Sequence, residues 1–145
     1  MGVLIYVALL WLTGCGSKGP ADSGPLTLRS EVVVEGLQAA VQVDSVAWET
    51  RSWALTGDGK FEINGSYGLF FRNLTDQPLE LRYDLRFLDR DTFLIDVFNP
   101  FGLPLRLGPH EGKRNGDDFS IRAEEPRALD ELQTMQVRVV VSNAQ

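Results

Sequence analysis

Apolar and charged residues alternate along residues 79–89, and this two-residue period predicts a β-strand. The odd positions from 79 to 87 are apolar: Leu79, Leu81, Tyr83, Leu85 and Phe87. Alternation of this kind places one face of a strand against a core and the other face in water. On a helix the same side chains would be scattered around the axis, so the pattern excludes an amphipathic helix here.

The same period continues through most of the chain and predicts an all-β protein. Residues 60–74 form a second expected strand, in which Gly65 and Gly68 predict a bulge or a bend. Only residues 128–133 have a helix-friendly composition, enough for one turn. Shorter strands are expected at 29–35, 40–48, 51–56, 93–98, 104–108, 119–123 and 135–142. Many short strands separated by turn residues indicate a single β-sandwich domain over residues 26–145.

The N-terminal segment has a different pattern, because its first 17 residues carry no charged side chain. Residues 3–12 form an unbroken apolar run of ten residues. As a helix this run would span about 15 Å, half the thickness of a bilayer core, which is too short for a membrane anchor. Its length is typical of the apolar part of a signal peptide, which we place at residues 1–14.

The end of the apolar run resembles the lipobox of bacterial lipoproteins, an apolar residue and two small residues before a cysteine. The matching residues are Leu12, Thr13, Gly14 and Cys15. The resemblance implies that Cys15 receives a diacylglycerol, that a peptidase cuts before it, and that an acyl chain is added to the new amino terminus. Gly16, where an inner-membrane protein more often has aspartate, implies the periplasmic face of the outer membrane. An ordinary secretory signal peptide or a buried strand is the alternative.

A short linker is expected between Cys15 and the domain, over residues 15–25. Seven of the ten residues 16–25 are Gly, Ser or Pro, a composition that cannot bury apolar surface. As a flexible chain the ten residues would reach about 17–19 Å. The linker would therefore keep the domain close to the lipid headgroups.

Composition removes several functional classes. The chain has 20 acidic and 14 basic residues, and a net charge of −6 argues against nucleic-acid binding. One cysteine and one histidine exclude a disulfide framework and leave little for thiolate zinc or histidine catalysis. His110 is expected in a solvated turn, and the acidic pairs at 117–118 and 124–125 are a solvated surface or, less readily, a loop calcium site. We expect no enzyme activity, no cofactor and no metal.

A second resemblance concerns the folded part. The run from Tyr83 to Asp89, with Asn73 and Thr75 just before it, is similar to the central strand of small YcfL-type lipoproteins and FxLYD-type domains. Residues 107–112 match the turn that follows in those families. The resemblance implies an Ig-like sandwich on a lipid anchor, and it carries over no catalytic residue.

Four aromatic residues are the candidate partner-binding side chains. Trp48 and Trp53 are expected on either side of a polar turn, and Phe98 and Phe101 in or beside a Pro/Gly loop. Exposed loop aromatics often contribute most to binding, although the same rings can close the ends of a sandwich. The sequence thus predicts a non-catalytic, lipid-anchored envelope protein that binds another envelope protein. A sandwich that binds a small ligand or glycan is the alternative.

Overall fold

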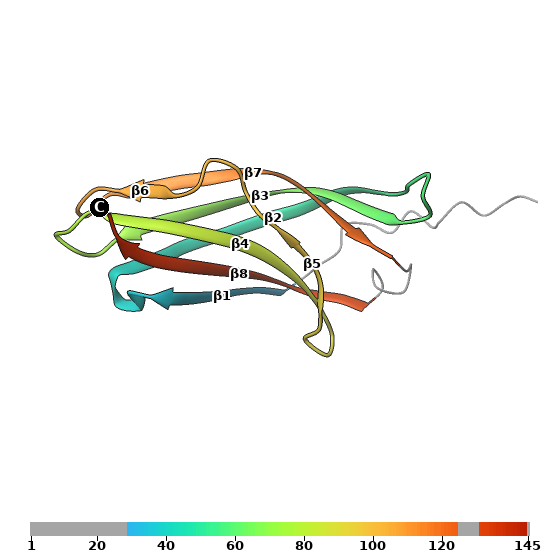
Figure 1. The fold of residues 1–145 in the computed structure, drawn as a ribbon, viewed down its shortest axis with the longest axis horizontal. Helices are drawn as coiled ribbons and strands as arrows, with labels where there is room; N and C mark the ends of the chain where they lie inside the picture. Colours follow the sequence, from blue (N-terminus) through green and yellow to red (C-terminus); the bar gives the residue numbers. More distant parts are fainter. Residues whose placement is uncertain (1–28, 125–130, 145) are drawn as a thin grey trace, which may run out of the picture.

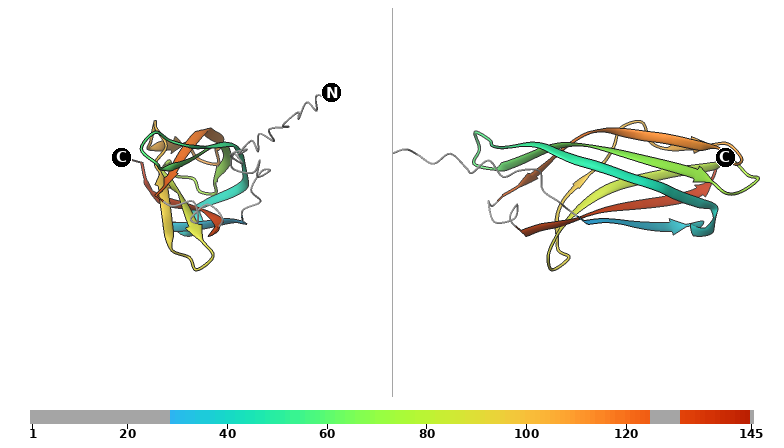
Figure 2. Two further views of the ribbon diagram at one scale, coloured as in Figure 1. Left: turned by 90° about the vertical axis from the view of Figure 1, so that its right-hand side faces the viewer. Right: turned by 180° about the vertical axis from the view of Figure 1, so that it is seen from behind.

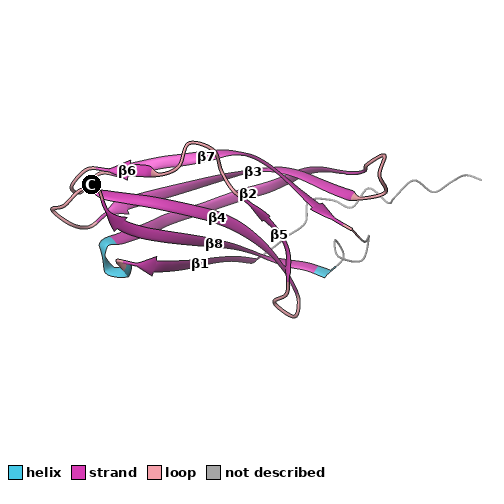
Figure 3. Cartoon of the chain, in the orientation of Figure 1, coloured by secondary structure: helices cyan, strands magenta, loops and turns pink. Residues whose placement is uncertain are grey.

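The protein consists of two β-sheets packed face to face, as a computed structural model that describes residues 29–124 and 131–144 shows (Figure 1). A short 3-10 turn, η1, joins the first two strands, and the other elements are strands (Figure 3). The elements are β1 (Arg29–Gly36), η1 (Gln38–Ala40), β2 (Val41–Leu55), β3 (Phe61–Asn73), β4 (Leu79–Asp89), β5 (Leu94–Phe98), β6 (Leu105–Leu107), β7 (Gly112–Ala123) and β8 (Leu132–Asn143). The all-β prediction and the sandwich are confirmed.

The two sheets differ in size, and the end-on view in Figure 2 separates their layers. One sheet has the order β1-β8-β4-β5, with β6 pairing β4 as a fifth strand. The other has the order β2-β3-β7. β1 runs parallel to β8, while the other pairs are antiparallel. β5 and β6 lie beside the two ends of β4, so the loop that joins them passes the middle of that strand.

The alternating pattern of β4 fixes the core between the sheets. Its odd positions are buried, and Leu85 lies opposite Val137 of β8 in a register that buries both side chains. On the other sheet, the odd positions of β3 face the same interior. The largest fully buried side chains are Phe71, Phe87, Ile63, Leu69, Leu79, Leu81, Leu85, Leu107, Ile121, Met135, Val137 and Val139.

The prediction of two strands at 40–48 and 51–56 with a turn between them was wrong. β2 is one strand of 15 residues that pairs with β3 along its whole length. The polar residues that favoured a turn are absorbed by a register shift between Thr50 and Ser52. Thr50 lies opposite Gly65, and a side chain at Gly65 would collide with the Glu49 carbonyl and the Phe119 ring. The bulge expected near Gly65 is therefore present, in the facing strand.

Two further boundaries differ from the prediction. β7 begins at Gly112 instead of residue 119. Its first half is polar and was therefore not predicted as strand from the sequence. A polar half-strand is tolerated here because β7 lies at the edge of its sheet, with much of its surface in water. β8 begins at Leu132, so residues 132 and 133 are strand instead of helix, while residues 128–130 lie outside the described residues. Pairing with β4 outweighs the local helix preference at Leu132.

The predicted signal peptide (1–14), Cys15 and the linker up to residue 25 lie outside the described residues. Over residues 29–124 and 131–144, the structure contains no helix long and apolar enough to cross a bilayer.

Candidate interaction surface

Asn73 joins the β3–β4 turn to the β6–β7 turn. Its side chain is 1% exposed, and its Nδ2 donates to the carbonyl oxygens of Gln77 at 2.7 Å and Gly108 at 2.8 Å. Its Oδ1 accepts from the amide and the hydroxyl of Thr75, at 2.8 and 2.9 Å. The backbone amide of Asn73 donates to the Glu111 carbonyl. The β3–β4 and β6–β7 turns thus meet around the buried side-chain amide of Asn73.

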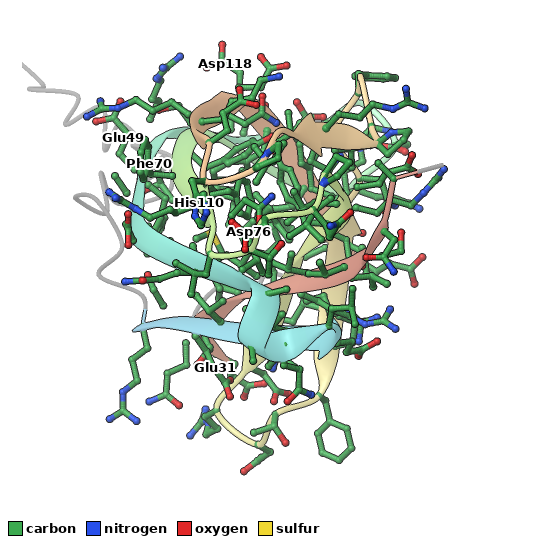
Figure 4. The ribbon with its side chains drawn as sticks, turned by 90° about the vertical axis from the view of Figure 1, so that its left-hand side faces the viewer. Glu31, Glu49, Phe70, Asp76, His110 and Asp118 are labelled. Carbon is green, nitrogen blue, oxygen red and sulfur yellow. The ribbon has the colours of Figure 1, made fainter. Side chains whose placement is uncertain are left out.

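His110 and Asp76 lie on the surface of these joined turns, where Figure 4 shows them facing each other. The distance from His110 Nε2 to Asp76 Oδ1 is 2.7 Å, and both side chains are mostly in water. His110 has φ 55°, and its backbone amide donates to the Thr75 carbonyl. A solvated pair of this kind supports the turn and offers no desolvated acid or base.

Trp48 and Trp53 lie within β2, and the prediction that they flank a turn was wrong. Trp48 is half-buried, packs against the core, and donates from Nε1 to Ser30 Oγ at 2.9 Å. Trp53 pairs through its backbone with Ile63, and its side chain lies outside the described part of the structure. Since Trp48 fills the space between the sheets near β1, it contributes to packing.

Phe98 ends β5 and points inward. Its ring is 6.0 Å from that of Tyr67 and 6.3 Å from that of Phe119, both in edge-on contact. Behind it the Tyr67 and Tyr83 hydroxyls lie 3.1 Å apart, and Asn115 donates from Nδ2 to the Tyr83 hydroxyl. Burial raises the pKa of Tyr67 and of Tyr83, so both phenols stay neutral. These hydroxyls satisfy one another inside the sandwich.

Of the three aromatic candidates whose side chains the structure describes, Phe101 is the one left in solvent, with 88% of its surface exposed. It sits in the β5–β6 loop, which Figures 1 and 2 show rising beside the edge of β7. Its neighbour Pro100 is buried, Leu103 packs against the core, and Gly102 adopts φ 78°. The loop is therefore anchored by buried residues on both sides of the exposed Phe101 ring.

A shallow groove of about 380 Å³ crosses the outer face of the three-stranded sheet. Its floor is a row of small residues, Ala47, Gly68 and Gly116, which lie side by side on β2, β3 and β7. Phe70 and Arg114, paired across β3 and β7, line one side. Figure 4 places Phe70 at this face, together with Glu49 and Asp118. The sequence analysis missed the groove, because the pairing of Gly68 with Gly116 depends on strand register.

The outer face of the five-stranded sheet carries a chain of ion pairs. Arg138 binds Glu35 through Nε and Nη2, both at 2.7 Å, and lies 3.8 Å from Asp84. Asp84 accepts from Arg86 at 2.8 Å. The hydrogen bonds from Arg138 hold the pKa of Glu35 below its usual range. These pairs satisfy one another and leave a solvated, mixed-charge face.

Metal ligation gains no support from the described residues. Within 29–124 and 131–144 there is no group of three or more His, Cys, Asp or Glu side chains placed to hold an ion. No described buried side-chain nitrogen or oxygen lacks a hydrogen-bond partner. Asp117 carries its charge close enough to Tyr67 and Tyr83 to raise the pKa of both, without joining such a group.

Comparison with known proteins places the chain in no family. No protein-family model matches the sequence, and no curated protein matches it. A solved structure with a partly similar arrangement is the crystal structure of Campylobacter jejuni Cj0090, at 13% sequence identity and a TM-score of 0.33. The match covers 77% of this chain and 97% of that one.

Proposed function

We propose that this protein is a lipid-anchored envelope protein whose β-sandwich binds another envelope protein, without catalysis, through the β5–β6 loop. The observation that carries the proposal is Phe101, 88% exposed between a buried proline and a leucine packed on the core. An exposed aromatic ring on a held loop loses little conformational freedom when it is buried by a partner. Such rings are the usual centres of binding energy in protein interfaces.

The anchor in this proposal is Cys15, and its location is the periplasmic face of the outer membrane. The support is the lipobox-like sequence at residues 12–15 and the linker that follows it. We also propose an Ig-like sandwich, supported by two sheets of mainly antiparallel strands within a domain of about 100 residues. The absence of catalysis is supported by the solvated state of His110 and by tyrosine hydroxyls that are paired with each other.

The loop is tested by photo-crosslinking in intact cells, with a photoreactive phenylalanine analogue at position 101. The expected result is one discrete adduct, whose partner is then purified. Phe101→Ala should weaken binding to that partner by about 2 kcal/mol, near thirtyfold in Kd. The melting temperature should change by no more than a degree or two, because the ring is not part of the core.

Leu74 provides a control, since it is also an exposed apolar residue, at 46%, in a different turn. The analogue at position 74 should not give the same adduct, and Leu74→Ala should not weaken the complex. A complex unaffected by Phe101→Ala, or adducts of equal yield at both positions, would refute the role of the loop.

The anchor is tested separately with Cys15→Ser. The variant should lose metabolic labelling by a fatty-acid analogue and leave the membrane fraction, because the sulfur that would carry the diacylglycerol is gone. Label that persists on the variant would refute lipidation at Cys15, whatever the outcome for Phe101.

The outer groove favours a second function, in which the sandwich binds a small ligand or a glycan. Phe70 offers an apolar side chain for a sugar and Arg114 a cation for an acidic substituent, beside a floor without large side chains. The test is titration with soluble peptidoglycan fragments, followed by the amide NMR signals of Gly68 and Gly116. Saturable shifts of the Gly116 signal that Gly68→Val abolishes would support this function, because Gly68 lines the groove and a Cβ there meets no other atom within 4 Å.

A further inference from the structure

The β4–β5 hairpin exposes two adjacent apolar side chains. Phe93 is 71% exposed and Leu94 is 54% exposed, and together we call them the apolar pair. The sequence pattern predicted a strand that starts at Phe93, whereas β5 pairs with β4 only from Leu94 onward. Adjacent exposed hydrophobic residues at a protruding tip are unusual for a surface that faces only water.

The hairpin tip has a defined shape. The Asp89 carboxylate accepts hydrogen bonds from the amides of Asp91 and Phe93, both at 2.8 Å. The backbone amide of Asp89 also donates to the Phe93 carbonyl, and the Asp89 carbonyl accepts from the Thr92 amide. Thr92 adopts φ 68°, a conformation that a β-branched residue rarely takes, so the surrounding bonds must hold it. The tip thus presents the apolar pair in a fixed orientation.

The tip lies at the end of the domain where the described chain begins. Thr134 of β8 pairs with Arg29 on one side and with Leu88 of β4 on the other. At the usual spacing of neighbouring strands, Arg29 and Leu88 are about 10 Å apart. Figures 1 and 2 show the hairpin projecting past β1 on this side of the sandwich. The residues that lead back to Cys15 therefore join the domain beside the base of the hairpin.

We propose that the apolar pair inserts into the lipid surface that holds the anchor and gives the domain a second membrane contact. The inference rests on the proposed lipidation of Cys15, because a linker with a reach of about 17–19 Å keeps this end near the headgroups. The tip is net acidic, since Arg90 pairs with Glu131 at 3.0 Å and Asp89 and Asp91 add two further carboxylates. The contact should therefore depend on apolar burial, and anionic lipid should not strengthen it.

The orientation leaves the β5–β6 loop free for a protein. Phe98 pairs with Leu85, further along β4 from the hairpin than Leu88. Phe101 follows on the flank of the sandwich, so one apolar site would face the membrane and the other a protein partner.

The test uses the full lipidated chain in vesicles of zwitterionic phosphatidylcholine that contain doxyl-labelled lipid. Cys15 is the only cysteine, and its diacylglycerol blocks the thiol, so an introduced cysteine can carry an environment-sensitive nitrobenzoxadiazole probe. The probe is placed by Phe93→Cys and, as a matched control, by Leu74→Cys. Leu74 is also an exposed apolar residue, at 46%, but it lies in the turn after β3 at the other end of the sandwich.

We expect the lipid quencher to quench the probe at position 93 several-fold more than the probe at 74. Iodide in the buffer should show the reverse order. Leu94→Ser in the Phe93→Cys chain should reduce the lipid quenching, because full burial of a leucine side chain changes partitioning about ten- to hundredfold. Replacing a quarter of the lipid by phosphatidylglycerol should not increase the lipid quenching, because the tip is net acidic.

The outcomes separate this inference from the proposed anchor. Protein that floats with the vesicles but shows equal quenching at positions 93 and 74 would overturn the membrane contact and leave the anchor standing. A probe at 93 that is shielded from iodide without lipid quenching would show a protein contact and would also overturn it. Protein that does not float would overturn the anchor, and the membrane contact with it.

Discussion

Replacing Asn73 should remove the connection between the β3–β4 and β6–β7 turns. Asn73→Ala deletes four side-chain hydrogen bonds and leaves the Gln77 and Gly108 carbonyls and the Thr75 amide without this partner. Two of these groups keep another partner, because the Gln77 carbonyl also accepts from the Thr75 hydroxyl and the Gly108 carbonyl from the Glu111 amide. A hydrogen bond contributes about 0.5–1.5 kcal/mol net, so we take the lower limit for each of the four bonds and expect a loss of about 2 kcal/mol. That is a substantial part of the roughly 5–15 kcal/mol typical of a domain.

The loss is measured as the free energy of unfolding from urea titrations. The matched control is Asp76→Asn in the same turn, which removes only an exposed pair with His110 and should cost less than about 1 kcal/mol. If Asn73→Ala also costs less than about 1 kcal/mol, the hydrogen bonds of Asn73 do not hold the turns together.

Asn73→Asp adds a test with a defined pH dependence. The new carboxylate would keep the acceptor role toward Thr75 but would face the carbonyl oxygens of Gln77 and Gly108 without a donor. Burial and these oxygens should raise its folded-state pKa above the unfolded value of about 3.9. The folded protein then binds the proton more tightly than the unfolded chain, so the stability of the variant falls as pH rises from about 4. A constant loss from pH 4 to pH 7 would contradict this.

The remaining predictions concern the core and the sheets. Leu85→Asp should lower the free energy of unfolding in urea by several kcal/mol, because it places a carboxylate at a fully buried position. Arg86→Gln on the outer face should cost less than about 1 kcal/mol, and equal losses would mean that the register of β4 is wrong. Tyr67 and Tyr83 have raised pKa values, so their contribution to stability is complete below the unfolded pKa of about 10 and declines above it. Tyrosinate absorbance from the domain should therefore appear only together with unfolding, and ionisation in the folded state would contradict their burial. Gly116→Ala should lower the melting temperature because the added methyl would meet the Tyr67 carbonyl, while Gly68→Ala on the facing strand should not, and similar effects from both would argue against the pairing of β3 with β7.

The strand of residues 79–89 was predicted with its boundaries, because its alternation comes from side chains that a sheet must sort between core and water. The predictions for β2 and β7 were less accurate because polar stretches interrupt the alternation in both strands. The polar residues in the middle of β2 are tolerated because a bulge opposite Gly65 accommodates them. The polar start of β7 is tolerated because β7 is an edge strand with exposed surface. Whether a strand is central, bulged or at an edge depends on its neighbours.

The candidate surface shows the same division. The sequence identified Phe98 and Phe101 as loop aromatics only three residues apart, and the structure buries much of one and exposes the other. The difference arises because Phe98 faces the Tyr67 and Phe119 rings of the opposite sheet, which no local pattern specifies.

The sequence by itself determined the all-β class, the sandwich and the inward faces of its most regular strands, because side-chain periodicity is a local property. Only the tertiary structure decided that Asn73 joins two turns, that Gly68 and Gly116 open a groove, and that the tip carrying Phe93 lies beside the start of the chain. Each of these depends on which strands pair and in which register. Register depends on how residues far apart in sequence share one buried face, so it is a property of the packed sheets rather than of any single segment.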